Sequence, residues 1–219
     1  MHARLGAPAL AIAIISVTAG LAAPAGAVVT RVRATALLAE IPTRSESTAG
    51  YDRSAFRHWV DADRNGCDTR AEVLIAESNT RPAVGTGCTI SGGRWISKYD
   101  KVRTTAPSGF DVDHLVPLAE AWQSGADQWD ADTRMRYAND LGYANSLIAV
   151  TASSNRSKGD REPQNWMPAY WRCNYVATWI AVKWRWQLAV DATERGFLES
   201  TLATCNNPSV VRPDRAPVT

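Results

Sequence analysis

The chain has 219 residues, of which 24 are Lys or Arg and 22 are Asp or Glu, so its formal net charge is +2. This balance excludes a strongly basic coat for nucleic acid, but it leaves room for a local basic patch. With 45% hydrophobic residues, the composition is that of a soluble globular protein and indicates no particular activity.

The first 27 residues have the pattern of a secretion signal. A short segment with Arg4 precedes an apolar run, Ala9 to Ala23, and small residues follow at Ala25-Gly26-Ala27, where a signal peptidase would cut. The run is too short and too rich in alanine for a membrane anchor. We therefore expect a secreted, extracellular protein with no stable membrane association after cleavage.

After the signal, residues 28–48 contain few aromatic side chains and are interpreted as a linker or a loosely attached N-terminal arm. Two short helices are expected next, over residues 51–60 and 69–78, because their apolar residues recur at helical spacing. Short β-prone pieces separated by glycine and serine follow between residues 85 and 105.

The second half of the chain alternates predicted strands and helices. Strands are expected over residues 112–118 and 146–151, with polar helix and loop over 120–141 between them. Ser153 is placed to cap a helix that begins at Ser154. An amphipathic helix follows, indicated by the apolar spacing of Tyr175, Trp179, Val182, Trp186 and Ala189. A final helix is expected over residues 192–204.

Four cysteines remain after signal cleavage, and an even number in a secreted protein indicates disulfides. Of the three pairings, the shortest loops favour Cys67–Cys88 and Cys173–Cys205. The cysteines do not indicate a zinc site, because no C-x-x-C pair is present. The polar, Pro-rich residues 206–219 are expected to form a disordered tail.

A calcium-loop pattern precedes the predicted helix over residues 69–78. In an EF-hand loop, oxygen atoms at fixed spacing surround the ion. The same spacing is found here at Asp61, Asp63, Asn65, Cys67 and Glu72. The cysteine would contribute its main-chain carbonyl. The alternative is an Asp/Asn/Gly turn closed by a disulfide, and a cation inside the loop, Arg70, favours that alternative. A structural calcium site is therefore kept as a hypothesis.

The residues best suited to chemistry gather in two segments. His114 lies in the segment DVDHLVP, with acidic residues directly beside the imidazole. Alternation along a strand would place Asp111 and Asp113 on one face and His114 on the other, unless the strand is bulged or ends there. The second segment, Asn155-Arg-Ser-Lys-Gly-Asp160, follows the next predicted strand and combines an amide with cations.

In this order, the segments DVDHLVPL, LIAVTASSNRSKGD and PQNWMP resemble the ββα-metal core of HNH endonucleases. In detail they are similar to the nuclease domain of the GmrSD restriction family and its secreted bacterial relatives. The resemblance extends more loosely from about Tyr51 to Cys205. It implies an α+β fold in which a ββα-metal (HNH) core is embedded in helices and held by two disulfides, with the nuclease domain over residues 49–205.

The resemblance also assigns roles to single residues. It implies that His114 is the general base, that Asp113 and Asn155 are metal ligands, and that Asn145 pins the loop holding the base. Flanking phosphates would be bound by the nearby cations Arg156, Lys158 and Arg161. Two oxygen ligands suit Mg²⁺ or Mn²⁺ better than Zn²⁺, which is kept as an alternative.

The implied reaction is metal-dependent hydrolysis of phosphodiester bonds in DNA, with RNA as a second candidate substrate. A neutral imidazole, with an unperturbed pKa of about 6.5, would take a proton from the attacking water. The metal would stabilise the leaving oxygen, and the products would carry 5′-phosphate and 3′-hydroxyl ends. Little sequence specificity and a monomeric state are expected, because no recognition domain or partner subunit is visible.

Two other classes of function remain as alternatives. One is a catalytically inactive secreted module on the same fold that binds nucleic acid or a cell surface. The presence of Asp113, His114, Asn145 and Asn155 together argues against it. The other is a Ser–His–Asp hydrolase, which no G-x-S-x-G segment supports. Trp166, beside the basic segment, is a candidate for contact with substrate.

Overall fold

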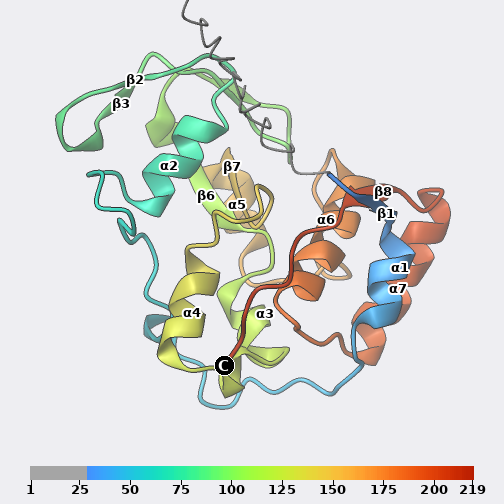
Figure 1. Cartoon of the computed structure of the whole chain (residues 1–219). Coiled ribbons are helices and arrows are strands. Elements are labelled where there is room, and N and C mark those ends of the chain that lie inside the picture. Colours follow the sequence, from blue (N-terminus) through green and yellow to red (C-terminus); the bar gives the residue numbers. More distant parts are fainter. Residues whose placement is uncertain (1–28) are drawn as a thin grey trace, which may run out of the picture.

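The computed structural model describes residues 29–219, so the predicted secretion signal over residues 1–27 lies outside the described residues. Figure 1 shows α1 and α7 on one side, α2 with the β2–β3 pair on the other, and β6 between them. The elements in chain order are β1 Arg31–Arg33, α1 Ala34–Glu40, η1 Arg53–Ala55, α2 Thr69–Ala76, β2 Ala83–Val84, η2 Thr86–Cys88, β3 Ile90–Ser91, β4 Trp95–Ile96, β5 Arg103–Thr104, η3 Pro107–Gly109, β6 Phe110–His114, α3 Leu118–Gln123, η4 Ala126–Gln128, α4 Ala131–Ala138, β7 Leu147–Thr151, α5 Ala152–Lys158, α6 Arg172–Arg185, α7 Ala192–Thr204 and β8 Ser209–Val211.

Strands β6 and β7 are the longest in the described chain and pair antiparallel, from Phe110 opposite Thr151 to His114 opposite Leu147. Successive side chains of a strand point to opposite faces, so each strand can serve two cores. Phe110 and Leu147 pack into a small cluster with α2, whereas Ile148 faces the main core. The pair therefore joins the two apolar cores of the described chain, one on each of its faces.

The main core is built around α6, which is buried on every side over Tyr175–Trp184. The amphipathic helix was predicted to extend to Ala189, but it ends at Arg185, and Trp186 and Ala189 lie in the buried segment that follows. Helices α1 and α7 pack against α6. Because partners cover the whole helix, its apolar residues are not confined to one stripe.

The segment expected to be a loose arm is part of the fold. Residues 31–33 form β1, which pairs with β8 near the C-terminus, and α1 buries Leu37 in the main core. The tail expected to be disordered contributes β8, and its last residue, Thr219, accepts a hydrogen bond from the main-chain N–H of Asp130. Both expectations from composition are corrected, because the two ends of the described chain pair with each other.

Local signals place the other helices. Aspartate side chains cap α2, α4 and α7 by accepting a hydrogen bond from a main-chain N–H three residues on. The helix predicted over residues 51–60 is only the short 3-10 turn Arg53–Ala55. The helix expected to begin at Ser154 begins at Ala152 instead, because Thr151 is its cap.

Both expected disulfides, Cys67–Cys88 and Cys173–Cys205, are present. The first ties the loop before α2 to η2, and the second ties the start of α6 to the residue after α7. The fold is thus mixed, with small two-stranded sheets among helices and two disulfides. Among the described residues, no helix is long and apolar enough to cross a membrane.

Candidate active site

Helix α5 places the second polar segment against β6. It follows β7 directly and ends at Lys158, and the next residue, Gly159, has a φ of 55° that suits a residue without a Cβ. Asn155 donates a hydrogen bond to Asp111 and Lys158 donates one to Asp113. The two acidic residues therefore share the face of β6 that α5 covers, as alternation along a strand predicts.

His114 is the last residue of β6 and is only 7% exposed. Its ring stacks on Trp59 with centroids 5.3 Å apart, and its Nε2 lies 2.9 Å from the carbonyl oxygen of Ala138. A carbonyl can only accept, so Nε2 carries the proton and Nδ1 carries the lone pair. Burial lowers the pKa of the imidazole to about 3, so the free side chain is neutral at physiological pH.

Asp113 lies in a buried polar network. Its Oδ1 accepts from Lys158 Nζ at 2.9 Å and its Oδ2 accepts from the Tyr99 hydroxyl at 2.5 Å. Burial raises the pKa of this carboxyl group, whereas the lysine and the tyrosine oppose the rise. Each oxygen retains a lone pair, so the carboxylate can still bind a cation while it is held in place.

Lys158 does not occupy the position expected of a phosphate ligand. Its side chain is fully buried, and its ammonium group also donates to the His114 carbonyl at 3.0 Å. The assignment of Lys158 to phosphate binding is therefore corrected: the lysine fixes the end of β6 from α5. A phosphate in the solvent-accessible pocket has no path to an ammonium group enclosed by protein.

The more exposed residues around His114 form a second polar group. Asn155 Nδ2 lies 3.2 Å from Asp111 Oδ2, and the guanidinium of Arg156 lies 3.6 Å from the same oxygen. The Arg156 side chain is 77% exposed, so its charge is available to a ligand from solvent. Arg161 is also exposed and donates to the main-chain carbonyl of Lys158 at 3.1 Å.

A pocket of about 270 Å³ brings these groups to one surface. It is lined by Arg53, Val112, Asp113, His114, Pro117, Leu118, Asn155, Arg156, Gly159 and Asp160. Three of the four predicted catalytic residues therefore share one pocket. Arg53 was not predicted, because it stands some 60 residues before the histidine and carries no motif of its own.

Asn145 lies outside this pocket. Its Oδ1 accepts from Lys98 at 3.2 Å, and it lines a separate pocket. The loop after the base is instead tied by Leu115 N–H to the carbonyl of Ser146, which directly follows Asn145. The expected contact of Asn145 with that loop is therefore made by the main chain of its neighbour. Trp166 packs edge-on against Tyr99 with centroids 5.1 Å apart and belongs to the edge of the core.

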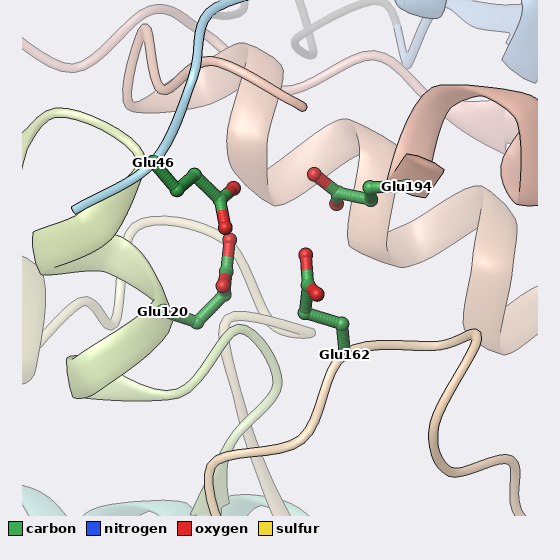
Figure 2. A group of neighbouring side chains, drawn as sticks. All are labelled: Glu46, Glu120, Glu162 and Glu194. Carbon is green, nitrogen blue, oxygen red and sulfur yellow. The ribbon is translucent and has the colours of Figure 1, made fainter. Parts of the chain in front are cut away.

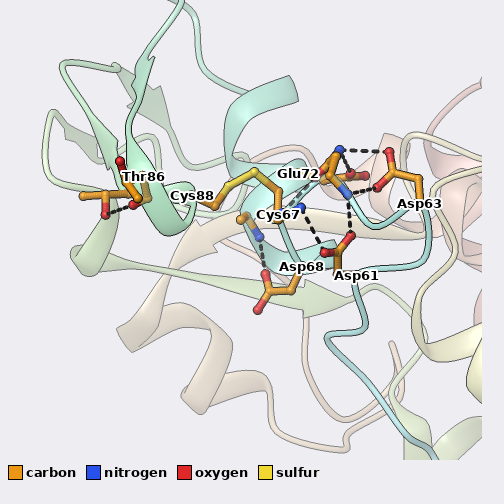
Figure 3. The surroundings of a disulfide bond; sticks show 11 residues. Asp61, Asp63, Cys67, Asp68, Glu72, Thr86 and Cys88 are labelled. Carbon is orange, nitrogen blue, oxygen red and sulfur yellow. Dashed lines mark hydrogen bonds between the residues drawn. A yellow bond between two sulfur atoms is a disulfide. The ribbon is translucent and has the colours of Figure 1, made fainter.

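The predicted calcium loop folds around one side chain (Figure 3). The amide of Asn65 donates to Asp63 at 2.8 Å and to Glu72 at 3.0 Å, and both oxygens of Asp61 accept main-chain N–H groups. Arg70, expected to disturb the loop, points away and donates to the carbonyl of Phe110. The Asn65 amide thus lies between the carboxylates of Asp63 and Glu72, and calcium binding stays a prediction.

We expect millimolar Ca²⁺ to raise the melting temperature of chelator-treated protein, because an ion bound only by the folded state stabilises it. Replacement of Asp63 by alanine should abolish the rise, since it removes a ligand at the third loop position. Scanning calorimetry with Ca²⁺ and with Mg²⁺ checks this. A wild-type melting temperature unmoved by Ca²⁺ would show that the loop is only a turn closed by the disulfide.

Four glutamates from separate segments meet beside α6 (Figure 2). One carboxylate oxygen of each lies within 4.8 Å of the others in the group Glu46, Glu120, Glu162 and Glu194. Such a group could hold a metal ion, but Lys183 already lies there, with its ammonium 2.6 Å from Glu120 and 2.5 Å from Glu194. One buried lysine cannot neutralise four carboxylates. Burial and neighbouring negative charge accordingly raise the pKa of Glu46 and Glu162 to about 8.

This cluster should make stability depend on pH. The folded state holds a proton on Glu162 up to a pKa of about 8, whereas the unfolded chain releases it near 4.5, so stability is lost as pH rises through that window. We expect Glu162→Gln to flatten the fall in melting temperature between pH 6 and 9. The same change at exposed Glu199 is the control. Equal slopes in wild type and Glu162→Gln would contradict a partly buried, protonated glutamate.

Comparison with known proteins adds to this geometry. Residues 74–198 match the family described as "GmrSD restriction endonucleases, C-terminal domain". The chain is 42% identical over 159 residues to an "Uncharacterized secreted protein" of the fungus Arthroderma benhamiae, a match that covers 71% of this chain and 76% of that protein. No solved structure matches significantly. The relative's printed name and the two disulfides fit an extracellular location.

Proposed function

Because the chain belongs to the family of GmrSD restriction endonuclease C-terminal domains, we propose that it is a secreted, metal-dependent nuclease. It hydrolyses DNA, and RNA as a second substrate, with little sequence specificity, and acts as a monomer. The geometry of His114 is the observation that supports the proposal most. Its Nε2–H donates to the Ala138 carbonyl, and its ring borders a pocket shared with Asn155 and Arg156.

The tautomer of His114 supports its role as general base. The hydrogen bond to Ala138 leaves Nδ1 as the nitrogen that can accept a proton from an attacking water. Stacking on Trp59 restrains the ring plane, so the base does not need to be oriented in each turnover. A substrate phosphate bound beside the ring would raise the low pKa of the imidazole and strengthen it as a base.

The oxygen donors of the pocket fit a hard divalent cation. Asp113 and Asn155 line the pocket and are the proposed protein ligands. Asp111 does not line it, but it is partly exposed and accepts a hydrogen bond from Asn155, so it offers a further carboxylate oxygen. Oxygen donors favour Mg²⁺ or Mn²⁺ over Zn²⁺. When bound, the cation would supply stabilisation of the negative charge that develops on phosphate and leaving oxygen. Lys158 and Tyr99 hold the Asp113 carboxylate in place for that purpose.

The arrangement of strands and helix supports an HNH assignment. The antiparallel pair β6–β7 is followed directly by α5, which packs on β6 and carries Asn155. This is the order of elements implied by the sequence resemblance. Arg156 and Arg161, both exposed on or after α5, are the proposed ligands of flanking phosphates in place of the buried Lys158.

A panel of end-labelled oligonucleotides tests this function. Single- and double-stranded DNA and RNA are incubated with the oxidised mature protein in Mg²⁺, Mn²⁺ or Zn²⁺ and in chelator. We expect internal cuts only with a divalent cation, and fragments that end in 5′-phosphate and 3′-hydroxyl. Binding without cleavage under every condition would replace the nuclease by the nucleic-acid-binding module.

A further inference from the structure

We propose that Arg53 is a phosphate-binding residue of this site, supplied by the N-terminal segment, and that it holds the substrate phosphate beside His114. The inference rests on the proposed function and deepens it. Arg53 lies outside residues 74–198, which match the family, so this wall of the pocket is added by the preceding segment.

The backbone at Arg53 is held firmly. It opens the 3-10 turn Arg53–Ala55, whose cap Asp52 accepts a hydrogen bond from the Ser54 N–H at 2.8 Å. Phe56, directly after the turn, is fully buried and packs edge-on against Trp122 and against a tyrosine of α4. A cation on an anchored turn reaches a ligand at a smaller entropic cost than one on a mobile arm.

The charge of Arg53 is directed to the pocket. The side chain is exposed and lines the pocket together with His114, Asn155 and Arg156. Within residues 29–219, no carboxylate forms an ion pair with its guanidinium, whereas Arg156 pairs with Asp111 and Lys158 pairs with Asp113. Asp160 is the remaining acid that lines the pocket. Of the two arginines that line the pocket, Arg53 is therefore the one without an ion pair among the described residues.

The chemistry of the group matches a phosphodiester. A guanidinium is planar and always charged, and it can donate two parallel hydrogen bonds to phosphate oxygens. A phosphate in the pocket gains from a nearby positive charge, because an anion moved out of water is costly unless it is paired. A guanidinium at this point would hold the phosphate before the proton is transferred.

Binding measurements separate this role from catalysis. The affinity for a fluorescent DNA duplex is measured in chelator over a range of salt, for wild type, Arg53→Ala, Arg53→Lys and Arg57→Ala. Arg57 is the control, because it is exposed in the same segment and does not line the pocket. We expect Arg53→Ala to weaken binding about tenfold and to reduce the slope of log affinity against log salt by about one, with Arg53→Lys keeping the slope.

Each outcome decides the inference. Equal binding by Arg53→Ala and Arg57→Ala would overturn it, as would a wild type without salt-dependent binding. If Arg53→Ala binds more weakly but wild type cuts nothing with any cation, Arg53 is a phosphate ligand and the nuclease proposal fails. If wild type cuts and Arg53→Ala shows a raised KM with its fold intact, both hold.

Discussion

Replacement of His114 by glutamine is expected to lower the turnover number by about two to four orders of magnitude, because the variant loses the base that accepts the proton of water. The glutamine amide retains a donor for the carbonyl of Ala138, so the hydrogen bond that orients residue 114 need not be lost. The metal ligands and the arginines of the pocket are unchanged. The loss should therefore appear in kcat more than in KM.

The measurement is steady-state cleavage of a labelled duplex, with a thermal melt of each variant. His58→Gln is the matched control, because Nδ1–H of this second described histidine donates to the Phe56 carbonyl and the residue does not line the pocket. It should keep its rate within a few-fold. A folded His114→Gln protein that cuts at the wild-type rate would remove the histidine from the mechanism.

Replacement of Lys158 by methionine is expected to lower the free energy of unfolding by about 3–5 kcal/mol. Methionine fills similar space, but it leaves the carboxylate of Asp113, 5% exposed, without its counter-charge. It also removes the donor to the His114 carbonyl. Urea unfolding measures the change, and the double variant Lys158→Met/Asp113→Asn should recover part of the loss because no buried charge remains.

The exposed neighbour provides the control for this experiment. Arg156→Ala should change stability by about 1 kcal/mol or less, because its ion pair with Asp111 is screened by solvent. If Lys158→Met unfolds like wild type and weakens DNA binding instead, Lys158 is a phosphate ligand as the sequence suggested. The stability and binding measurements thus separate a buried positioning residue from a substrate contact.

Sequence patterns were informative where the physical cause is local. The prediction of a helix over residues 69–78 matches α2, and that of a strand over 146–151 matches β7. The strand predicted over 112–118 is offset: β6 is Phe110–His114, and α3 begins at Leu118. The pairing with the shortest loops correctly predicted both disulfides, Cys67–Cys88 and Cys173–Cys205. The few aromatics of residues 28–48 and the polar composition of residues 206–219 led to wrong predictions, because β1 and β8 are stabilised by pairing with each other.

The candidate site was predicted only in part, because contacts between distant segments leave no local sequence pattern. His114 and Asn155 belong to a motif, so they could be named from the sequence, and the structure brings them to one pocket. The burial of Lys158 depends on how α5 packs, which no local pattern reveals. Arg53 and the glutamates around Lys183 come from distant segments, and only the folded chain brings them together.

The most direct test of the central claim is conversion of supercoiled plasmid to nicked and linear forms by the oxidised mature protein. We expect conversion in Mg²⁺ or Mn²⁺, none in chelator, and none above background by the folded His114→Gln variant. A wild-type protein that leaves plasmid DNA and RNA intact with every divalent cation would contradict it.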